Sequence, residues 1–299
     1  MRIMNWRVVI VAVVSAFVSQ EIAAQANILN AKKPEEIGLR TEAQKAADND
    51  KPLPYGYVDD RDILWSKTVW EVIDLNERIN FPLLYPIDTI DMSSDRRSLY
   101  DVLLKNFKDG TLKDVYVDSY FTERRSFDDL RATLSKIDTL DAGYDQINAG
   151  EEVSPEFIVR RDLTAADIAQ YRIKGIWYFD IRQGELKYRL LGIAPVAPDV
   201  NFIDNDEPAL VELFWVWFPG ARDILHEAKA FNNRNSAMPI SFDHLLNSRR
   251  FNAMIYKEDN VYGDRMVEDY VHDNALFLLL ESNRIRESIR DREQDMWSY

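Results

Sequence analysis

The stretch that decides the fold reads Gly175-Ile-Trp-Tyr-Phe-Asp-Ile-Arg182, then Gln183-Gly184, then Glu185-Leu-Lys-Tyr-Arg-Leu-Leu191. Two aromatic and β-branched runs, separated by two residues of which the second is glycine, are typical of a β-hairpin. A two-residue turn predicts polar pairs on one face: Arg182 with Glu185, Asp180 with Lys187 and Tyr178 with Arg189. Apolar residues then meet on the other face: Trp177, Phe179 and Ile181 lie opposite Leu190, Tyr188 and Leu186. A shift by one residue would break both matches, so the pattern predicts this pairing.

A third run, Leu210-Val-Glu-Leu-Phe-Trp-Val-Trp-Phe218, is apolar on both faces except at Glu212. This pattern predicts a covered strand in the middle of the sheet. Glu212 would have a raised pKa if it were buried alone. The favoured explanation for a carboxylate in this apolar run is an edge position or a salt bridge to an arginine such as Arg189.

Residues 63–137 are expected to be mostly helical. Apolar residues between Ile63 and Ile79 recur near helical spacing and predict an amphipathic helix. Ser98 is expected to cap a second helix that ends before Gly110. Residues 115–121 predict a strand, and residues 127–137 predict another helix. The acidic segment Asp138–Ser154 is interpreted as a surface loop or as a boundary between residues 63–137 and residues 155–299.

Residues 155–299 are expected to mix helices and strands. Four helices are predicted: one opened by the capping-box residues Thr164-Ala-Ala-Asp167, one with Pro219 in its first turn, one opened by Ser241, and one from Arg265 to about Trp297. Residues 252–257 predict a short strand. The expected fold class is therefore α+β, with an antiparallel core formed by the hairpin 175–191 and the strand 210–218, packed with helices.

The first residues have the pattern of a secretory signal peptide, interpreted as residues 1–26. Arg2 and Arg7 precede the apolar residues 8–18, and Ala24-Gln25-Ala26 supplies a small-x-small cleavage site. The apolar core is too short to cross a bilayer, which needs roughly 20 residues. The sequence contains no cysteine, so a lipid-anchored cysteine and a disulfide framework are excluded. Together these features predict a periplasmic location with no direct membrane anchor.

The charge balance restricts the partners. The chain has 37 Lys and Arg against 51 Asp and Glu, a formal net charge of −14. Such a charge repels nucleic acids and anionic lipids and leaves a basic protein partner, or no partner, as the expectation. The alternative is that the acidity only maintains solubility.

Residues 27–62 are polar and rich in proline, and we interpret them as an extended arm. The arm is either disordered or ordered on a neighbouring subunit, and Tyr55 and Tyr57 would anchor it there. Trp297 and Tyr299 are aromatic residues at a terminus that has little core to join. Tyr55, Tyr57, Trp297 and Tyr299 are therefore the predicted partner-binding residues.

No catalytic motif is present. The sequence has 3 histidines, with no HExxH or other metal-ligand spacing, and it lacks G-x-S-x-G, a phosphate loop and G-x-G-x-x-G. The prediction is that the chain has no catalytic, cofactor-binding or metal site and is not an enzyme. A pair of carboxylates that meets only in space stays possible on sequence grounds.

Several sequence blocks occur in a fixed order: Trp177-Tyr-Phe-Asp-Ile-Arg-x-Gly184, Tyr188-Arg-Leu-Leu-Gly-Ile-Ala-Pro195, Leu213-Phe-Trp-Val-Trp-Phe-Pro-x-Ala-Arg222, Phe231-Asn-x-x-Asn235, Ser241-Phe-Asp243, Lys257-Glu-x-Asn-Val-Tyr262 and Glu293-Gln-Asp-Met-Trp297. In this order they resemble the GldN/PorN family of gliding-motility and type IX secretion proteins. The resemblance implies a periplasmic subunit that forms a ring with an outer-membrane lipoprotein of the GldK/PorK type. It also implies contact with the periplasmic domain of a GldM/PorM-type motor.

Two other hypotheses compete with a structural ring subunit. The first is a periplasmic hydrolase that acts on cell-wall glycan through a carboxylate pair. The second is a glycan-binding module that uses exposed aromatic side chains.

Overall fold

The computed structural model describes residues 33, 50–90, 96–150, 154–202, 208–232, 235, 238–271 and 274–297. The predicted signal peptide, most of the predicted arm and Tyr299 lie outside these residues. The chain divides into two units, Met1–Lys51 and Pro52–Tyr299. The fold below is that of the second unit.

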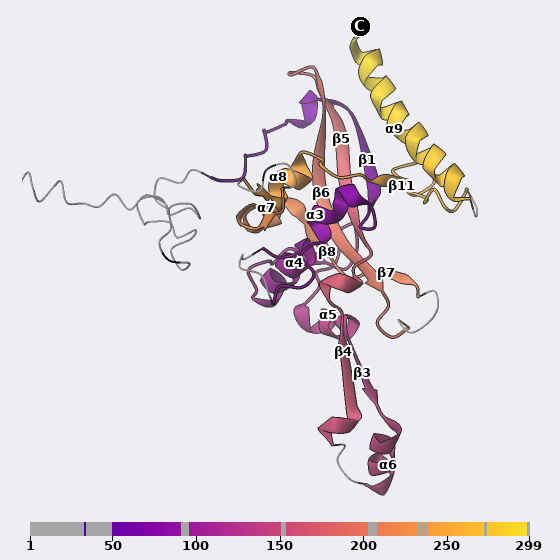
Figure 1. Ribbon diagram of the computed structural model, residues 1–299. Coiled ribbons are helices and arrows are strands. Elements are labelled where there is room, and N and C mark those ends of the chain that lie inside the picture. Colours follow the sequence, from indigo (N-terminus) through magenta and orange to yellow (C-terminus); the bar gives the residue numbers. More distant parts are fainter. Residues whose placement is uncertain are drawn as a thin grey trace, which may run out of the picture. The chain divides into compact units, whose positions relative to one another are not determined.

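A seven-stranded antiparallel sheet forms the centre of this unit, in the order β11-β1-β5-β6-β8-β2, with β7 also paired to β6 (Figure 1). Its strands are β1 (Ile63–Asp74), β2 (Val115–Tyr116), β5 (Gln170–Asp180), β6 (Glu185–Pro198), β7 (Leu210–Glu212), β8 (Trp215–Trp217) and β11 (Met254–Glu258). Two smaller pairs are β3 (Ser135–Thr139) with β4 (Ile158–Asp162), and β9 (Lys229–Ala230) with β10 (Ile240–Ser241).

Seven helices accompany this sheet in the described residues, and the expected α+β fold class is confirmed. They are α3 (Phe81–Leu84), α4 (Leu99–Lys108), α5 (Phe127–Leu134), α6 (Asp141–Ala149), α7 (Phe218–Glu227), α8 (Phe242–Asn247) and α9 (Ala275–Trp297). Short 3₁₀ turns are η2 (Asp60–Asp62), η3 (Arg78–Asn80), η4 (Pro155–Phe157) and η5 (Ala165–Asp167). Helices α7 and α8 contact β6, whereas α9 contacts β11 (Figure 1).

The predicted hairpin is confirmed, but its predicted register is wrong by two residues. Asp180 pairs with Glu185, and Trp177 pairs with Tyr188, so residues 181–184 form the turn. The Asp180 side chain explains the longer turn, because its Oδ1 accepts hydrogen bonds from the backbone of Arg182 and Gln183. Gly184 has a φ of 65°, which glycine adopts without strain. A shift of two residues keeps every side chain on its face, so the face pattern could not distinguish the two registers.

The predicted helix over residues 63–79 is wrong, because the structure forms strand β1 there. This strand pairs with β5 on one side and with β11 on the other. Val69, Trp70 and Ile73 are buried on the strand. Aromatic and β-branched residues favour such a strand, and burial of both faces removes the alternation that identifies a half-exposed one.

The predicted strand 210–218 is also wrong in its extent and place. The structure forms β7 and β8 there, and Phe218 begins α7. β8 lies between β6 and the edge strand β2, whereas the middle of the sheet is β1, β5 and β6. The run is apolar because Phe214 packs in the main core while Trp215 packs with Trp70 in a separate cluster.

Most helix starts were predicted correctly from capping residues. The Ser98 Oγ accepts a hydrogen bond from the backbone of Asp101, and the Ser241 Oγ accepts one from His244. Pro219 lies in the first turn of α7, and Gly110 follows α4 with a φ of 72°. The Thr164 capping box opens only the 3₁₀ turn η5.

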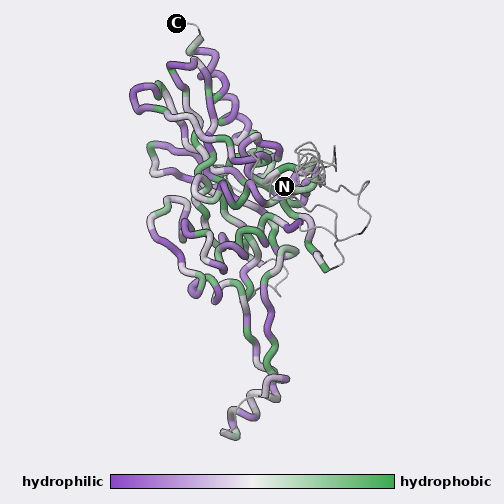
Figure 2. The backbone as a smooth tube through the Cα atoms, turned by 90° about the vertical axis from the view of Figure 1, so that its left-hand side faces the viewer, coloured by the Kyte–Doolittle hydropathy of each residue, from purple (hydrophilic) through white to green (hydrophobic). Residues whose placement is uncertain are grey.

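Other predicted elements are shorter than expected. The predicted strand 115–121 reduces to β2, the helix 127–137 ends at Leu134, and the last helix begins at Ala275. The predicted strand 252–257 is confirmed as β11. The acidic segment predicted as a loop instead includes α6, at the end of a two-stranded ribbon of β3 and β4 that extends away from the sheet (Figures 1 and 2).

Candidate protein-interaction surfaces

Tyr55, one of the predicted partner-binding residues, lies half-buried against its own chain. Its hydroxyl donates a hydrogen bond to the Asn247 Oδ1 at 2.8 Å. The guanidinium of Arg222 lies 4.1 Å from the centre of its ring, and that of Arg189 lies 4.8 Å away. Burial raises the pKa of Tyr55 to about 12. These contacts anchor the end of the predicted arm to α7, α8 and β6.

The residues after Tyr55 follow the β5–β6 hairpin. The Arg189 Nη2 donates to the backbone oxygen of Gly56 at 2.9 Å, and the Arg182 Nη2 donates to that of Tyr57 at 3.1 Å. The Tyr57 side chain is 79% exposed. Trp297 is the last residue of α9, but its side chain and Tyr299 lie outside the described residues. Partner binding by these four residues therefore stays a prediction.

We expect Tyr55→Ala to release this segment from the hairpin. The ring gives up two cation–π contacts and a hydrogen bond, each worth about 0.5–2 kcal/mol. Hydrogen exchange of the backbone amides in residues 55–62 should become at least tenfold faster. Tyr57→Ala is the matched control and should leave exchange unchanged, because its side chain is exposed. Unchanged exchange in Tyr55→Ala would show that backbone contacts alone hold the segment.

Glu212 forms an ion pair, but not with the arginine that was expected. Its Oε1 accepts a hydrogen bond from the Arg172 Nη1, and its Oε2 accepts one from the Trp215 Nε1. Arg189 instead holds the segment around Gly56. The favoured salt-bridge explanation is thus confirmed with Arg172 as the partner.

A buried ion pair that the sequence did not indicate joins β1 to the loop after α8. Glu71 is 1% exposed and receives two hydrogen bonds from Arg249, at 2.8 and 2.9 Å. The guanidinium of Arg249 also lies 4.2 Å from the ring centre of Tyr188. Burial raises the pKa of Tyr188 well above its usual range. Glu71 and Arg249 are 178 positions apart, so only the folded chain brings them together.

Two lysines lie against aromatic rings on the opposite face of β1. The Nζ of Lys174 is 4.8 Å from the ring centre of Trp70, and that of Lys257 is 4.5 Å away. Burial, and then the neighbouring charge of Lys257, lower the pKa of Lys174. Lys257 donates to the Tyr120 hydroxyl, which donates to Asp264. These contacts tie the segment after β2 to the sheet.

Asp243, which directly precedes His244 in the sequence, pairs with an arginine. Asp243 receives two hydrogen bonds from Arg222, at 2.8 and 3.1 Å, and a third from Asn247. Its charge is therefore satisfied without His244, which contributes its backbone amide to the Ser241 cap. In the part of the chain that the structure describes, no group of three or more His, Asp or Glu side chains is placed to hold a metal ion.

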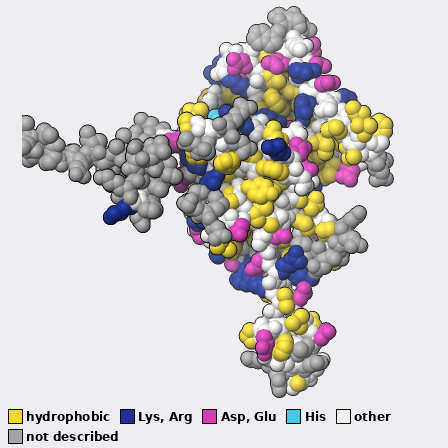
Figure 3. All heavy atoms as spheres, in the orientation of Figure 1, with side chains coloured by type: hydrophobic (Ala, Val, Ile, Leu, Met, Phe, Trp, Pro, Cys, Tyr) yellow, Lys and Arg dark blue, Asp and Glu magenta, His cyan; other side chains and the backbone are white. Residues whose placement is uncertain are grey.

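An exposed apolar surface covers the start of α9 (Figure 3). We call it the α9 surface; it comprises Leu276, Phe277, Leu279 and Leu280. Further along the same helix, Ile285 and Ile289 are buried with Val69 and Ile255. The helix is thus held to the sheet by its later turns, while its first turns present leucines and a phenylalanine outward. Contiguous exposed apolar patches mark protein-interaction sites.

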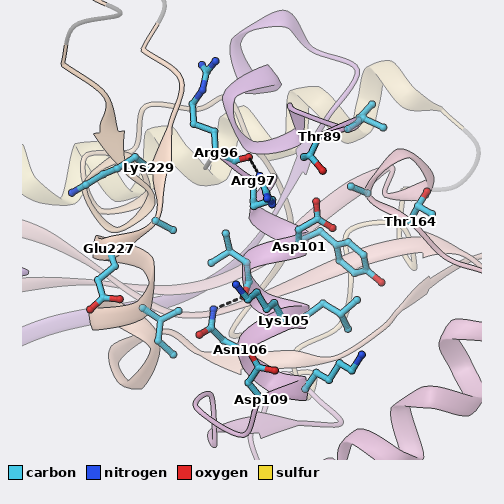
Figure 4. A pocket seen from close by; sticks show the side chains of 18 of the residues that line it. Thr89, Arg96, Arg97, Asp101, Lys105, Asn106, Asp109, Thr164, Glu227 and Lys229 are labelled. Carbon is cyan, nitrogen blue, oxygen red and sulfur yellow. Dashed lines mark hydrogen bonds between the residues drawn. The ribbon is translucent and has the colours of Figure 1, made fainter. Parts of the chain in front are cut away.

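A groove of about 1010 Å³ runs along α4 (Figure 4). Its apolar wall includes Tyr100, Leu104, Leu163, Ala165, Ile224 and Ala228. Its charged lining has five cations, Arg96, Arg97, Lys105, Lys108 and Lys229, against three acids, Asp101, Asp109 and Glu227. In Figure 4 Asp101, Lys105, Asn106 and Asp109 follow one another down α4, with Glu227 and Lys229 on one side and Thr164 on the other. A groove with a net positive lining is notable in a chain of net charge −14.

The structure therefore presents an α+β domain whose candidate sites are surfaces for other macromolecules. The family described as "Gliding motility associated protein GldN" matches residues 58–298, and the chain belongs to this family. The match covers the whole sheet and every helix described above, which confirms the resemblance found in the sequence blocks. No curated protein matches the chain. No described helix is long and apolar enough to cross a membrane.

Proposed function

We propose that the chain is a periplasmic structural subunit of the gliding and type IX secretion machinery. It assembles with an outer-membrane lipoprotein of the GldK/PorK type into a ring, and the ring contacts the periplasmic domain of a GldM/PorM-type motor. The single observation that carries this proposal is the family match over residues 58–298, since the family is associated with gliding motility.

The α9 surface supports the proposal that the chain binds another protein. Its leucines and its phenylalanine lie on the first turns of a helix that the sheet holds in place through Ile285 and Ile289. Burial of such side chains contributes about 1.5–3 kcal/mol each, so a few of them can account for a stable contact. We assign the α9 surface to the lipoprotein.

The decisive measurement is the mass of the chain co-expressed with its lipoprotein, by light scattering in mild detergent. We expect a megadalton species with on the order of tens of copies of each subunit. Two proteins that never associate would overturn the proposal. In that case, hydrolysis and binding of cell-wall glycan become the functions to test.

Phe277→Asp should weaken the lipoprotein complex at least a hundredfold, because it places a charge within the apolar contact. Phe202→Asp is the matched control: Phe202 is 58% exposed and Phe277 56%, but Phe202 lies in the loop after β6. Affinity measured by biolayer interferometry on the immobilised lipoprotein distinguishes the two variants. An equal effect of both substitutions would remove the assignment of the α9 surface.

A further inference from the structure

The β3–β4 ribbon exposes apolar side chains along its strands and at its end. Ile137, Ile158 and Val159 on its strands, and Leu140 and Tyr144 at its end, are all exposed, with Ile137 at 63%. A two-stranded ribbon on its own is only marginally stable in water. In Figures 1 and 2 the ribbon extends away from the sheet, so the sheet does not cover these side chains. They are available to another molecule.

The end of the ribbon carries one sign of charge. The described residues 138–150 and 154–156, which we call the tip, include acidic residues and no lysine or arginine. Asp138, Asp141 and Glu156 are exposed. The tip therefore combines negative charge with the exposed Leu140 and Tyr144.

The groove along α4 has the complementary character. Lys105 and Lys108 are exposed on its rim, and its wall is apolar. A cavity of about 1010 Å³ is at the upper end of the range for ligand pockets and accommodates a short helix or loop. From these matching features we propose that the tip of one molecule binds in the α4 groove of a second copy of this chain.

A molecule cannot place its own tip in its own groove. Leu163 and Thr164, which directly follow β4, line the groove, so the base of the ribbon lies beside it. The five residues of β4 then carry the tip about 17 Å away, at roughly 3.4 Å per residue. Only a neighbouring molecule can offer its groove to this tip.

The contact joins two different surfaces and is therefore head-to-tail. Repeated around a closing rotation, such a contact generates a ring, and without closure it generates a filament. The biological role of the contact rests on the proposed ring, whereas the contact itself is testable on the purified chain.

Cysteine crosslinking tests the contact directly, because the chain has no cysteine of its own. Tyr144→Cys in the tip and Lys105→Cys in the groove are combined in one chain and oxidised with copper phenanthroline. We expect a ladder of disulfide-linked multimers on a non-reducing gel, while each single variant forms dimers at most. Tyr144→Cys with Lys113→Cys is the control, because Lys113 is exposed outside the groove and should give no ladder.

Charge reversal provides a second test that does not depend on disulfide geometry. Asp141→Lys with Glu156→Lys reverses the tip, and Lys105→Glu with Lys108→Glu reverses the groove. Each pair alone should weaken self-association at least tenfold in sedimentation velocity, because like charges then face each other. A mixture of the two variants should recover it, since each tip again meets a groove of opposite charge. Glu123→Lys and Lys113→Glu, both exposed elsewhere, are the controls.

The outcomes separate this contact from the proposed function. Absence of the ladder, together with a mixture that does not recover, overturns the tip-to-groove contact. So does a chain that shows neither self-association nor crosslinks at high concentration. Lipoprotein binding through the α9 surface is measured separately, so the ring subunit proposal stands or falls on its own result.

Discussion

Arg249→Leu is expected to destabilise the domain by about 3 kcal/mol, because it leaves the Glu71 carboxylate buried without its partner. Glu71 lies in the middle of the sheet on β1 and is 1% exposed, so water cannot replace the two hydrogen bonds from Arg249. For a domain of this size the loss lowers Tm by about 6–12 °C. Calorimetry or urea unfolding of the chain from Asn27 onward measures it.

A double variant separates the charge from the packing. Glu71→Leu with Arg249→Leu removes both charges, and buried ion pairs replaced by apolar residues are often neutral in stability. The double variant should therefore recover about 2 kcal/mol of the loss in Arg249→Leu. Arg124→Ala is the exposed control, and its pair with Asp114 should contribute at most about 1 kcal/mol. If the double variant is less stable than Arg249→Leu, packing rather than the unpaired charge dominates.

The prediction of β1 as a helix shows where local sequence patterns fail. Val69 to Ile73 holds four apolar residues around Glu71, and a run covered on both faces has no period of two. Trp70, Val72 and Ile73 have strand propensity and so favour the strand that the structure forms. The spacing of Trp65, Val69 and Val72, however, is that of a helical face. The pairing with β5 and β11, supplied by distant residues, decides the conformation.

Local signals that involve one backbone group were more reliable. Ser98 and Ser241 cap the helices that the sequence predicted, because a hydroxyl reaches the amide three residues later whatever the rest of the chain does. Asp180 supplied a signal of the same kind, since aspartate caps turns, and it would have predicted the longer hairpin turn. The α4 groove and the pair of Glu71 with Arg249 have no such local signal, because each joins elements far apart in the sequence.

Gly175→Ala should destabilise the domain by about 3 kcal/mol, at the upper end of the cost of overpacking. A Cβ at residue 175 would lie 2.1 Å from the Tyr188 hydroxyl oxygen and 2.3 Å from Cζ of the same ring. A glycine inside a strand often marks such a close approach, and here the ring of the paired strand lies over it. The ring cannot move aside, because Trp177 packs at 5.0 Å between ring centres and Arg249 lies on its face.

The steric origin predicts strong coupling between the two positions. Tyr188→Leu removes Cζ, Cε2 and the hydroxyl, the atoms that the new Cβ would strike, so Gly175→Ala should cost about 2 kcal/mol less in that background. Gly56→Ala is the matched control. No atom lies within 4 Å of a Cβ added at residue 56, so the free energy of unfolding should change by less than about 0.5 kcal/mol. Urea unfolding of the four chains in the cycle measures the coupling. Equal costs of Gly175→Ala in both backgrounds would place the effect in the strand backbone, at the bulge between Lys174 and Gly175, rather than in the contact with Tyr188.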